Sequence, residues 1–263
     1  MTKKLKDNTE ILVIPDAHCK GSVSNERFDW LGKLAVKRQP EYIVCIGDWA
    51  DMASLSFYDK GSVYQEGLRY QDDVNASLDA LARFHKQIDD YNKKKKKSKK
   101  HHYKPKLIYC VGNHENRINR YAASNPEMVG HLSIDDLGFK QYGWEVVPYL
   151  TPKIIEGIAF QHCFTSGVMG KPIGGLNHAA NLLSKGAISQ VCGHSHLLDY
   201  SERLNAAQEK ICALVVGCYL DHPEHYTTEQ KRWWSGLMYL RDVNKGSYTP
   251  EPLTYEWVKR SFS

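Results

Sequence analysis

The chain has 263 residues, of which 42% are hydrophobic and 25% charged, a composition typical of a globular protein. Its mean hydropathy of −0.52 argues against an integral membrane protein. No apolar run approaches the roughly 18 residues that a membrane-spanning helix needs. The four apolar residues at 11–14 are too few for the core of a signal peptide, so we expect a cytoplasmic protein that binds no membrane.

The cysteines and lysines narrow the class further. Seven dispersed cysteines without a CxxC pair predict buried, reduced thiols rather than a disulfide framework or a thiolate zinc site. Residues 93–106 contain nine lysines and no acidic residue, which accounts for the net charge of +5. We interpret them as a Lys-rich insertion in a single domain spanning 1–263. Such a run is usually solvated. Alternatively, Lys93–Lys100 contacts nucleic-acid phosphates, which would make binding salt-dependent.

The first half of the chain alternates between predicted strands and helices. Continuous apolar runs predict strands at 11–18, 42–46 and 107–111. Helical spacing predicts one helix at 25–38, a second capped by Asp72 that ends at the lysine run, and a short third ending near Asn125. This alternation predicts parallel strands joined by right-handed crossovers.

The second half is richer in short strands. We predict strands at 144–149, 153–155, 158–163, 188–192, 211–216, 237–242 and 253–258. A helix at 176–183, closed by Gly186, interrupts this series.

Polar clusters follow five of the predicted strands. They read Asp16-x-His18, Gly47-Asp48-x-x-Asp51, Gly112-Asn113-His114-Glu115, His162 and Gly193-His194-Ser195-His196. Open α/β sheets place their sites at the carboxyl ends of strands. Alternate side chains of a strand share a side, so Asp16 and His18 can reach one ion, and the glycines are expected to permit sharp turns. Oxygen and imidazole donors suit manganese, iron, zinc, nickel or cobalt.

In this order the five clusters resemble the motifs of the calcineurin-like metallophosphoesterase family: DxH, GDxxD, GNH(E/D), a lone His and GHxH. The resemblance spans residues 16–196 and implies an α/β fold of two mixed β-sheets packed face to face, with helices outside. It implies two divalent ions, for which manganese is our first choice. The ligands it implies are Asp16, His18 and His196 for one ion, Asn113, His162 and His194 for the other, and Asp48 as the bridge. It also implies that His114, oriented by Asp51, is an acid or charge stabiliser.

The expected function is a dinuclear metal-dependent phosphoesterase in which a metal-bridging hydroxide attacks phosphorus. Two such ions lower the pKa of a bound water toward ~7. Monoesterase and diesterase activity both remain open, and the lysine cluster favours nucleotides or nucleic acid. Met52 and Ala53 follow Asp51 where the protein-phosphatase branch reads Arg-Gly, so a protein serine/threonine phosphatase is the weaker alternative. A non-catalytic scaffold of the same fold is disfavoured, because every expected ligand is present.

Several further residues have two interpretations each. Arg117 is a candidate phosphate-binding residue or a plain surface arginine, and His178 could face the pocket. His85, His101, His102 and His131 are interpreted as structural or solvated. His222 and His225 look like a second metal pair, but we interpret them as part of a polar loop. Trp233 and Trp234 are expected in core or lid packing rather than as a platform for bases. Specificity is expected from the loops at 52–71, 164–177 and 219–235.

Overall fold

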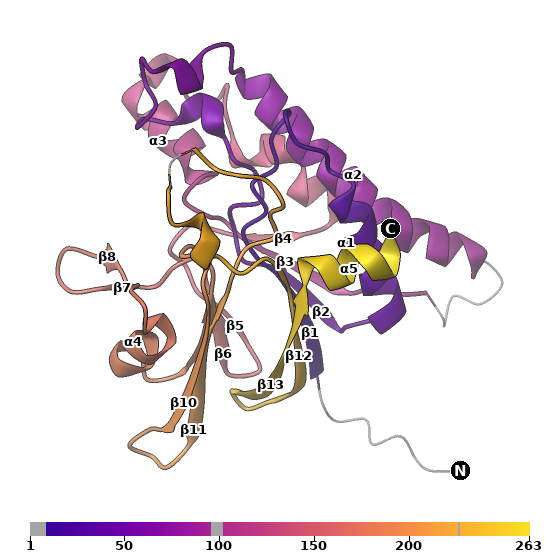
Figure 1. Cartoon of the computed structure of the whole chain (residues 1–263), viewed down its shortest axis with the longest axis vertical. Helices are drawn as coiled ribbons and strands as arrows, with labels where there is room; N and C mark the ends of the chain where they lie inside the picture. The colour runs from indigo at the N-terminus through magenta and orange to yellow at the C-terminus, as the bar shows by residue number, and fades with distance from the viewer. Residues whose placement is uncertain (1–8, 96–101, 226) are drawn as a thin grey trace.

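Two β-sheets pack face to face with helices on both outer sides (Figure 1). The computed structural model describes residues 9–95, 102–225 and 227–263. The six-stranded sheet has the order β13 (Ser247–Thr254), β12 (Gly236–Asn244), β1 (Thr9–Ile14), β2 (Tyr42–Cys45), β3 (Lys106–Cys110), β4 (Glu145–Val147). The five-stranded sheet has the order β10 (Leu198–Leu204), β11 (Lys210–Val216), β9 (Ser189–Cys192), β6 (Ile158–Phe160), β5 (Lys153–Ile155). A small hairpin pairs β7 (Thr165–Ser166) with β8 (Lys171–Pro172).

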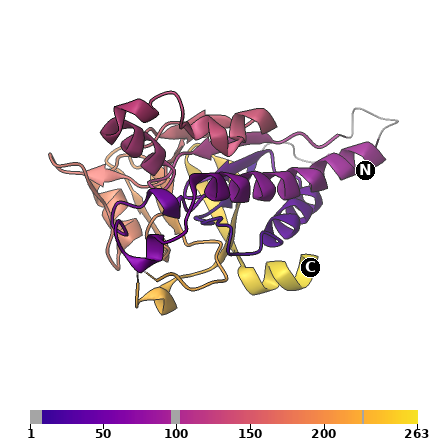
Figure 2. The same cartoon turned by 90° about the horizontal axis from the view of Figure 1, so that it is seen from above.

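The helices are divided between the two outer faces. They are α1 (Arg27–Arg38), α2 (Tyr70–Lys94), α3 (Asn116–Ser124), α4 (His178–Lys185) and α5 (Tyr255–Phe262). Helices α1, α2 and α5 lie together on the side of the six-stranded sheet, as Figure 2 also shows, and α4 covers the other sheet. The expected four-layer sandwich of two mixed sheets with flanking helices is therefore confirmed.

The alternation of side chains along β1 shows how the layers are filled. Ile11 and Val13 belong to the apolar layer between the two sheets. Leu12 and Ile14 point the other way, into the layer that also holds the buried faces of α1, α2 and α5. All four side chains are fully buried. A strand that is covered on both faces requires an uninterrupted apolar run, which is why the sequence signal here is strong.

The predicted parallel order of the first half is confirmed. Strand β1 pairs in parallel with β2, and β2 with β3. In the second sheet, β6 and β9 are also parallel neighbours. The carboxyl ends of five strands are thereby brought to one end of the sandwich. Three of these strands (β1, β2 and β3) belong to the six-stranded sheet and two (β6 and β9) to the five-stranded sheet. The predicted burial of all seven cysteines is likewise confirmed, and none forms a disulfide.

The predicted strand at 253–258 is wrong beyond Thr254. There the chain turns into α5, because the Thr254 side chain accepts a hydrogen bond from the Trp257 backbone and caps the helix. Tyr255, Val258 and Phe262 then recur at helical spacing and are buried against the rest of the fold. The helical spacing of the apolar residues over 255–262 is the feature of the sequence from which this helix could have been predicted.

One strand and two helix starts also differ from expectation. Strand β10 was not predicted, because most of its side chains are exposed and it lacks an apolar alternation. Asp72 does not cap α2, which begins at Tyr70 with Arg69 as its N-cap, so Asp72 lies in the first turn and complements the helix dipole. Helix α4 begins at His178, and Leu176 lies outside it with its side chain 73% exposed.

The central part of the lysine run lies outside the described residues, which stop at 95 and resume at 102. It begins at the carboxyl end of α2, a helix of 25 residues, about 37 Å from the first turn of that helix. The interpretation of Lys93–Lys100 as a nucleic-acid contact, like that of His101, therefore stays a prediction. Among the helices in the described ranges, none combines the length and apolar character needed to span a bilayer.

Candidate metal centre

The five polar clusters meet where the strands end. Asp16 and His18 follow β1, Asp48 and Asp51 follow β2, and Asn113 and His114 follow β3. His162 follows β6, and His194 and His196 follow β9. Hydrogen bonds between the turns hold them together: the backbone N–H groups of His114 and His194 donate to Asp48 Oδ1 and Asp16 Oδ2, each at 2.9 Å.

One group of potential ligands consists of Asp16, His18 and His196. Their donor atoms lie within 4.8 Å of one another, and all three residues are buried. His196 Nε2 is 3.1 Å from Asp16 Oδ2. Burial opposes ionisation of Asp16, but His162 and His196 outweigh it and lower the pKa of this carboxyl group. Burial and the neighbouring His114 lower the pKa of His18, which favours the neutral imidazole that a metal ion binds.

A second group gathers around Asp48. Asn113 Oδ1 lies 2.8 Å from both His162 Nε2 and His194 Nδ1, and these two nitrogens are 3.3 Å apart. Asp48 Oδ2 is 3.3 Å from His162 Nε2 and 3.8 Å from His18 Nε2. Asp48 therefore reaches both groups with one oxygen. Burial and His162 lower the pKa of His194 to about 4, so that this imidazole is neutral.

These groups fit divalent ions. Asp16 Oδ1 and His18 Nε2 are buried and have no hydrogen-bond partner among the described residues. Buried polar atoms are nearly always partnered in proteins, so these two orphaned atoms call for a ligand. A cation would also have three donor atoms close together here, because His162 Nε2, His194 Nδ1 and Asn113 Oδ1 lie within 3.3 Å of one another. The donors are oxygen and nitrogen throughout, which suits the borderline divalent metals.

His114 stands beside this centre and is held by Asp51. Its Nδ1 lies 2.8 Å from the Asp51 carbonyl oxygen and 2.9 Å from Asp51 Oδ1. Nδ1 therefore carries the hydrogen, and Nε2 faces Asp48 Oδ2 at 3.9 Å. Burial and the neighbouring Arg117 would lower the pKa of His114, but Asp48 and Asp51 outweigh them and raise it to about 9.

Two of the three glycines act differently from expectation. Gly47 does adopt a left-handed φ of 105°, but Gly112 and Gly193 do not. Four of the candidate ligands are left-handed instead: His18, Asp48, His194 and His196 have φ between 43° and 69°. A left-handed non-glycine residue costs roughly 1–2 kcal/mol. Gly112 and Gly193 are needed for close approach, because a Cβ would collide with Asp48 Oδ1 or Asp16 Oδ1, respectively.

Glu115 is a structural residue of the site that sequence analysis assigned no role. It is fully buried, and its carboxylate accepts backbone N–H bonds from Asp48 at 3.1 Å, Ala50 at 2.9 Å and Gly112 at 2.9 Å. Burial and the nearby Asp48 raise the pKa of Glu115 to about 7, while the backbone donors favour its anion. Its place after His114 in a strand-end motif was the only signal in the sequence.

A second set of residues missed by sequence analysis lies behind Asp51. Lys20 Nζ is 2.8 and 2.9 Å from the two carboxylate oxygens of Glu224 and 3.8 Å from Asp51 Oδ2. His222 Nε2 bonds Glu224 at 2.8 Å, which agrees with a polar loop rather than a second metal pair. The ring of His225 stacks on that of Tyr64, 4.2 Å away. The Lys20–Glu224 contact joins residues 204 positions apart, and no local pattern in the sequence predicts it.

The remaining candidates line or support the cavity above the centre. This cavity has a volume of about 160 Å³. It is lined by His18, Asp48, Asn113, His114, His194, Ser195, His196 and Trp233. Trp233 meets the His196 ring edge to face at 4.1 Å and so forms a wall of the site, whereas Trp234 packs against the layer between the sheets. His178 does not line the cavity. It is buried, and its Nδ1 contacts Ser195 Oγ at 3.0 Å, so it supports the turn between two ligands.

Comparison with known proteins adds two distant likenesses. No protein-family model matches the sequence, and no curated protein matches it either. The solved structure of YfcE, a phosphoesterase from E. coli, is similar with a TM-score of 0.39 and 12% identity over 94% of this chain and 100% of that chain. The Pseudomonas putida nuclease MPE is similar with a TM-score of 0.35 and 16% identity over 92% and 87% of the two chains. At TM-scores below 0.5, these likenesses carry no argument about function.

Proposed function

We propose that this protein is a metal-dependent phosphoesterase whose centre holds two divalent ions. The observation that carries the proposal is the pair of buried donor groups that share Asp48, one around Asp16, His18 and His196, the other around Asn113, His162 and His194. Divalent ions bound there would supply Lewis-acid charge for phosphoryl oxygens and acidify a water molecule near neutral pH.

The charge of the donor set suits an anionic substrate. Asp16 and Asp48 are the carboxylates of the two groups, and the remaining ligands, an amide and four imidazoles, are neutral when they bind an ion. Two divalent ions therefore keep an excess of positive charge, which attracts a phosphate ester. An all-carboxylate site of the same size would have cancelled that charge.

The role proposed for His114 follows from its hydrogen bonds. Asp51 holds the Nδ1 hydrogen and turns Nε2 toward the cavity, while Asp48 and Asp51 favour the protonated ring. His114 can then stabilise or protonate the departing oxygen of the ester, a contribution of roughly 10²–10⁴-fold. Arg117 lies beside it, with Nη2 3.2 Å from His114 Nε2, and is placed to meet a substrate oxygen.

A phosphoester panel tests the proposal. The purified chain is stripped with EDTA, reloaded with Mn²⁺ and assayed on an aryl monoester, an aryl diester, nucleotides and a phosphopeptide. We expect hydrolysis that Mn²⁺ restores and that Asp48→Asn abolishes without changing the circular dichroism spectrum. The phosphopeptide reports on the protein-phosphatase alternative. Absence of turnover on every ester, or near-normal turnover by Asp48→Asn, would overturn the proposal.

A further inference from the structure

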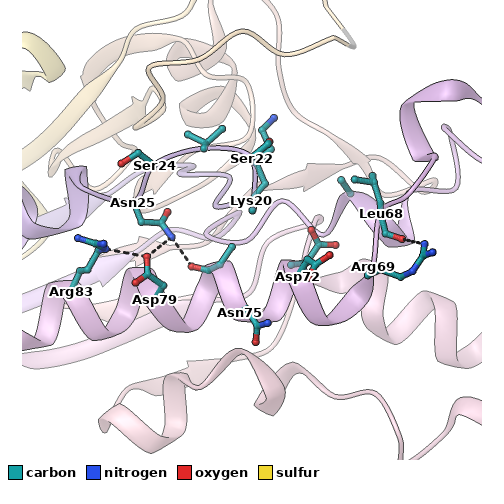
Figure 3. A pocket seen from close by; sticks show the side chains of 15 residues that line it. Lys20, Ser22, Ser24, Asn25, Leu68, Arg69, Asp72, Asn75, Asp79 and Arg83 are labelled. Atoms are coloured by element: carbon teal, nitrogen blue, oxygen red, sulfur yellow. Dashed lines mark hydrogen bonds and ion pairs between the residues drawn. The ribbon is translucent and has the colours of Figure 1, made fainter.

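Two larger cavities border the segment 53–68, and they differ in charge. The first, of about 580 Å³, lies between residues 20–25 and α2 (Figure 3). Three aspartates line it, and Asp79 already accepts hydrogen bonds from Arg83 at 3.0 Å and Asn25 at 3.1 Å. Because its acidic groups are numerous and its polar groups bond one another, this cavity is a poor receptor for an anion.

The second cavity, of about 510 Å³, lies between residues 54–68 and α3. This volume is in the range of ordinary ligand pockets. Among the described residues that line it there are three cations and three aromatic rings but no carboxylate: Lys60, Arg117, Arg120, Phe57, Tyr58 and Tyr121. We call it the Tyr58–Arg120 pocket.

The cations of the Tyr58–Arg120 pocket are available to a ligand. Within the described ranges, neither Lys60 nor Arg120 lies within ion-pair distance of a carboxylate. The Arg117 guanidinium donates to the backbone carbonyls of Asp51 and Met52, at 3.0 and 3.3 Å, and its charge also acts on the nearby carboxylates of Asp59 and Asp73. Because three cations and no carboxylate line this concave surface among the described residues, it attracts a phosphate-bearing ligand.

The aromatic rings of this pocket are unusually exposed. Phe57 is 72% and Tyr58 86% exposed, and their ring centroids are 6.4 Å apart. Tyr121, on the opposite wall formed by α3, is 39% exposed. Exposed aromatic side chains beside arginines are the surfaces on which nucleobases stack. An anion with a flat ring system matches the pocket better than an aliphatic phosphate does.

Arg117 connects this pocket with the metal centre. It lines the Tyr58–Arg120 pocket and lies 3.2 Å from His114, which lines the cavity above the metal ligands. Because His114 is the residue placed to meet the departing oxygen, the group attached to that oxygen extends past Arg117 into the Tyr58–Arg120 pocket.

We propose that the Tyr58–Arg120 pocket is the leaving-group subsite and that it binds a nucleotide unit, with a base on Tyr58 and a second phosphate at Arg120 and Lys60. This inference rests on the proposed function, from which it takes the role of His114. On hydrolysis, water adds its oxygen to phosphorus and the P–O bond to the nucleotide unit breaks. The leaving oxygen takes up a proton from His114, and the proton lost by the attacking water balances it. The unit can be a free nucleotide or one residue of a single strand, which share this chemistry.

Binding in the presence of EDTA tests the inference without hydrolysis. The full-length chain is titrated against a fluorescently labelled single-stranded oligothymidylate of ten nucleotides, followed by anisotropy. Unlabelled thymidine monophosphate, the same single strand, a duplex and inorganic phosphate serve as competitors. We expect the single strand to compete. Competition by the mononucleotide as well identifies the unit itself as sufficient, and competition by the strand alone identifies a strand as the source; both support the subsite.

Variants locate the binding. We expect Tyr58→Leu to weaken binding by about 5- to 100-fold and Tyr58→Trp to retain it, because stacking needs a ring. Arg120→Ala should lower the salt slope of binding by about 0.7, the loss of one phosphate contact. Arg260→Ala, at an exposed arginine of α5 remote in sequence from the pocket, is the matched control and should bind like the unaltered chain.

Three results would overturn the subsite: inorganic phosphate competing as well as nucleotides, the duplex competing as well as the single strand, or Tyr58→Leu and Arg120→Ala binding like the control. Since binding in EDTA requires neither metal nor turnover, these failures leave the ester panel untouched. If the chain binds the single strand but hydrolyses no ester, the proposed phosphoesterase function is wrong, while the Tyr58–Arg120 pocket remains a nucleotide-binding site.

Discussion

The two carboxylates at the centre divide their oxygens between structure and ligand binding. Asp48 Oδ1 accepts the backbone N–H of His114, which leaves Oδ2 facing the imidazoles of His18 and His162. Asp16 Oδ2 accepts the N–H of His194, and Oδ1 is left without a partner among the described residues. A backbone donor thus fixes the orientation of each carboxylate before any ion arrives, which lowers the entropy cost of binding one.

Replacement of His114 by alanine tests its role at the leaving oxygen. We expect turnover of an alkyl phosphate ester to fall by roughly 10²–10⁴-fold. The loss should be much smaller for a para-nitrophenyl ester, whose departing oxygen needs little protonation. Asn119→Ala, at an exposed position of α3, is the control. Equal losses for both esters would show that His114 does not act on the leaving group.

Replacement of Glu115 by alanine tests the support beneath the ligands. It would leave three buried backbone N–H groups of Asp48, Ala50 and Gly112 without an acceptor. Each such group costs about 1–3 kcal/mol, so the free energy of unfolding in urea, measured in EDTA at pH 8, should fall by about 3 kcal/mol or more. Glu115→Gln, which keeps one acceptor oxygen, should lie between. An unchanged free energy of unfolding for Glu115→Ala would contradict this support.

At the scale of elements, the parallel strands were the most predictable part. β1, β2 and β3 are covered on both faces, so their apolar runs are continuous and the polar turns after them stand out. The candidate site could be predicted for the same reason, since its residues lie in those turns. Strand β10 and the Lys20–Glu224 contact could not, because exposed pairing and distant ion pairs leave no periodic pattern. The apolar residues of helix α5 do recur at helical spacing. Because the helix is short and directly follows a strand, this spacing was difficult to recognise in the sequence.

The packing of α2 predicts a pH dependence of stability. His85 on this helix accepts a hydrogen bond from Trp144 Nε1 at 2.8 Å, and burial lowers its pKa to about 4. Unfolded histidine has a pKa near 6.5. The unfolded chain therefore gains a proton first as the pH falls, and the stability present above about pH 6.5 is lost progressively toward about pH 4, by about 3 kcal/mol in total.

The variant His85→Gln isolates this contribution, because its amide oxygen can still accept from Trp144 but does not titrate. Unfolding in urea is measured for both chains at pH 7.5 and pH 4.5. We expect the stability advantage of the histidine chain to shrink by about 2.5 kcal/mol at the lower pH. A constant difference between the two chains would contradict the buried, neutral state of His85.

At the scale of the whole molecule, the sandwich joins segments that are far apart in the sequence. The six-stranded sheet supplies Asp16, His18, Asp48 and Asn113, and the five-stranded sheet supplies His162, His194 and His196. Because each ligand group takes residues from both sheets, the apolar layer that sets the separation of the sheets also sets the distance that each group spans. Two of the three loops expected to carry specificity meet the site: the 219–235 loop brings Trp233, and residues 54–68 wall the Tyr58–Arg120 pocket.

The most direct test of the central claim is the number of ions that this arrangement binds. The stripped chain is equilibrated with Mn²⁺, freed of excess ion by gel filtration and analysed by plasma mass spectrometry alongside Asp48→Asn. We expect two manganese ions per chain, and fewer in the variant, because Asp48 reaches both ligand groups. One ion or none in the unaltered chain, or equal loading of the variant, would contradict a centre built around Asp48.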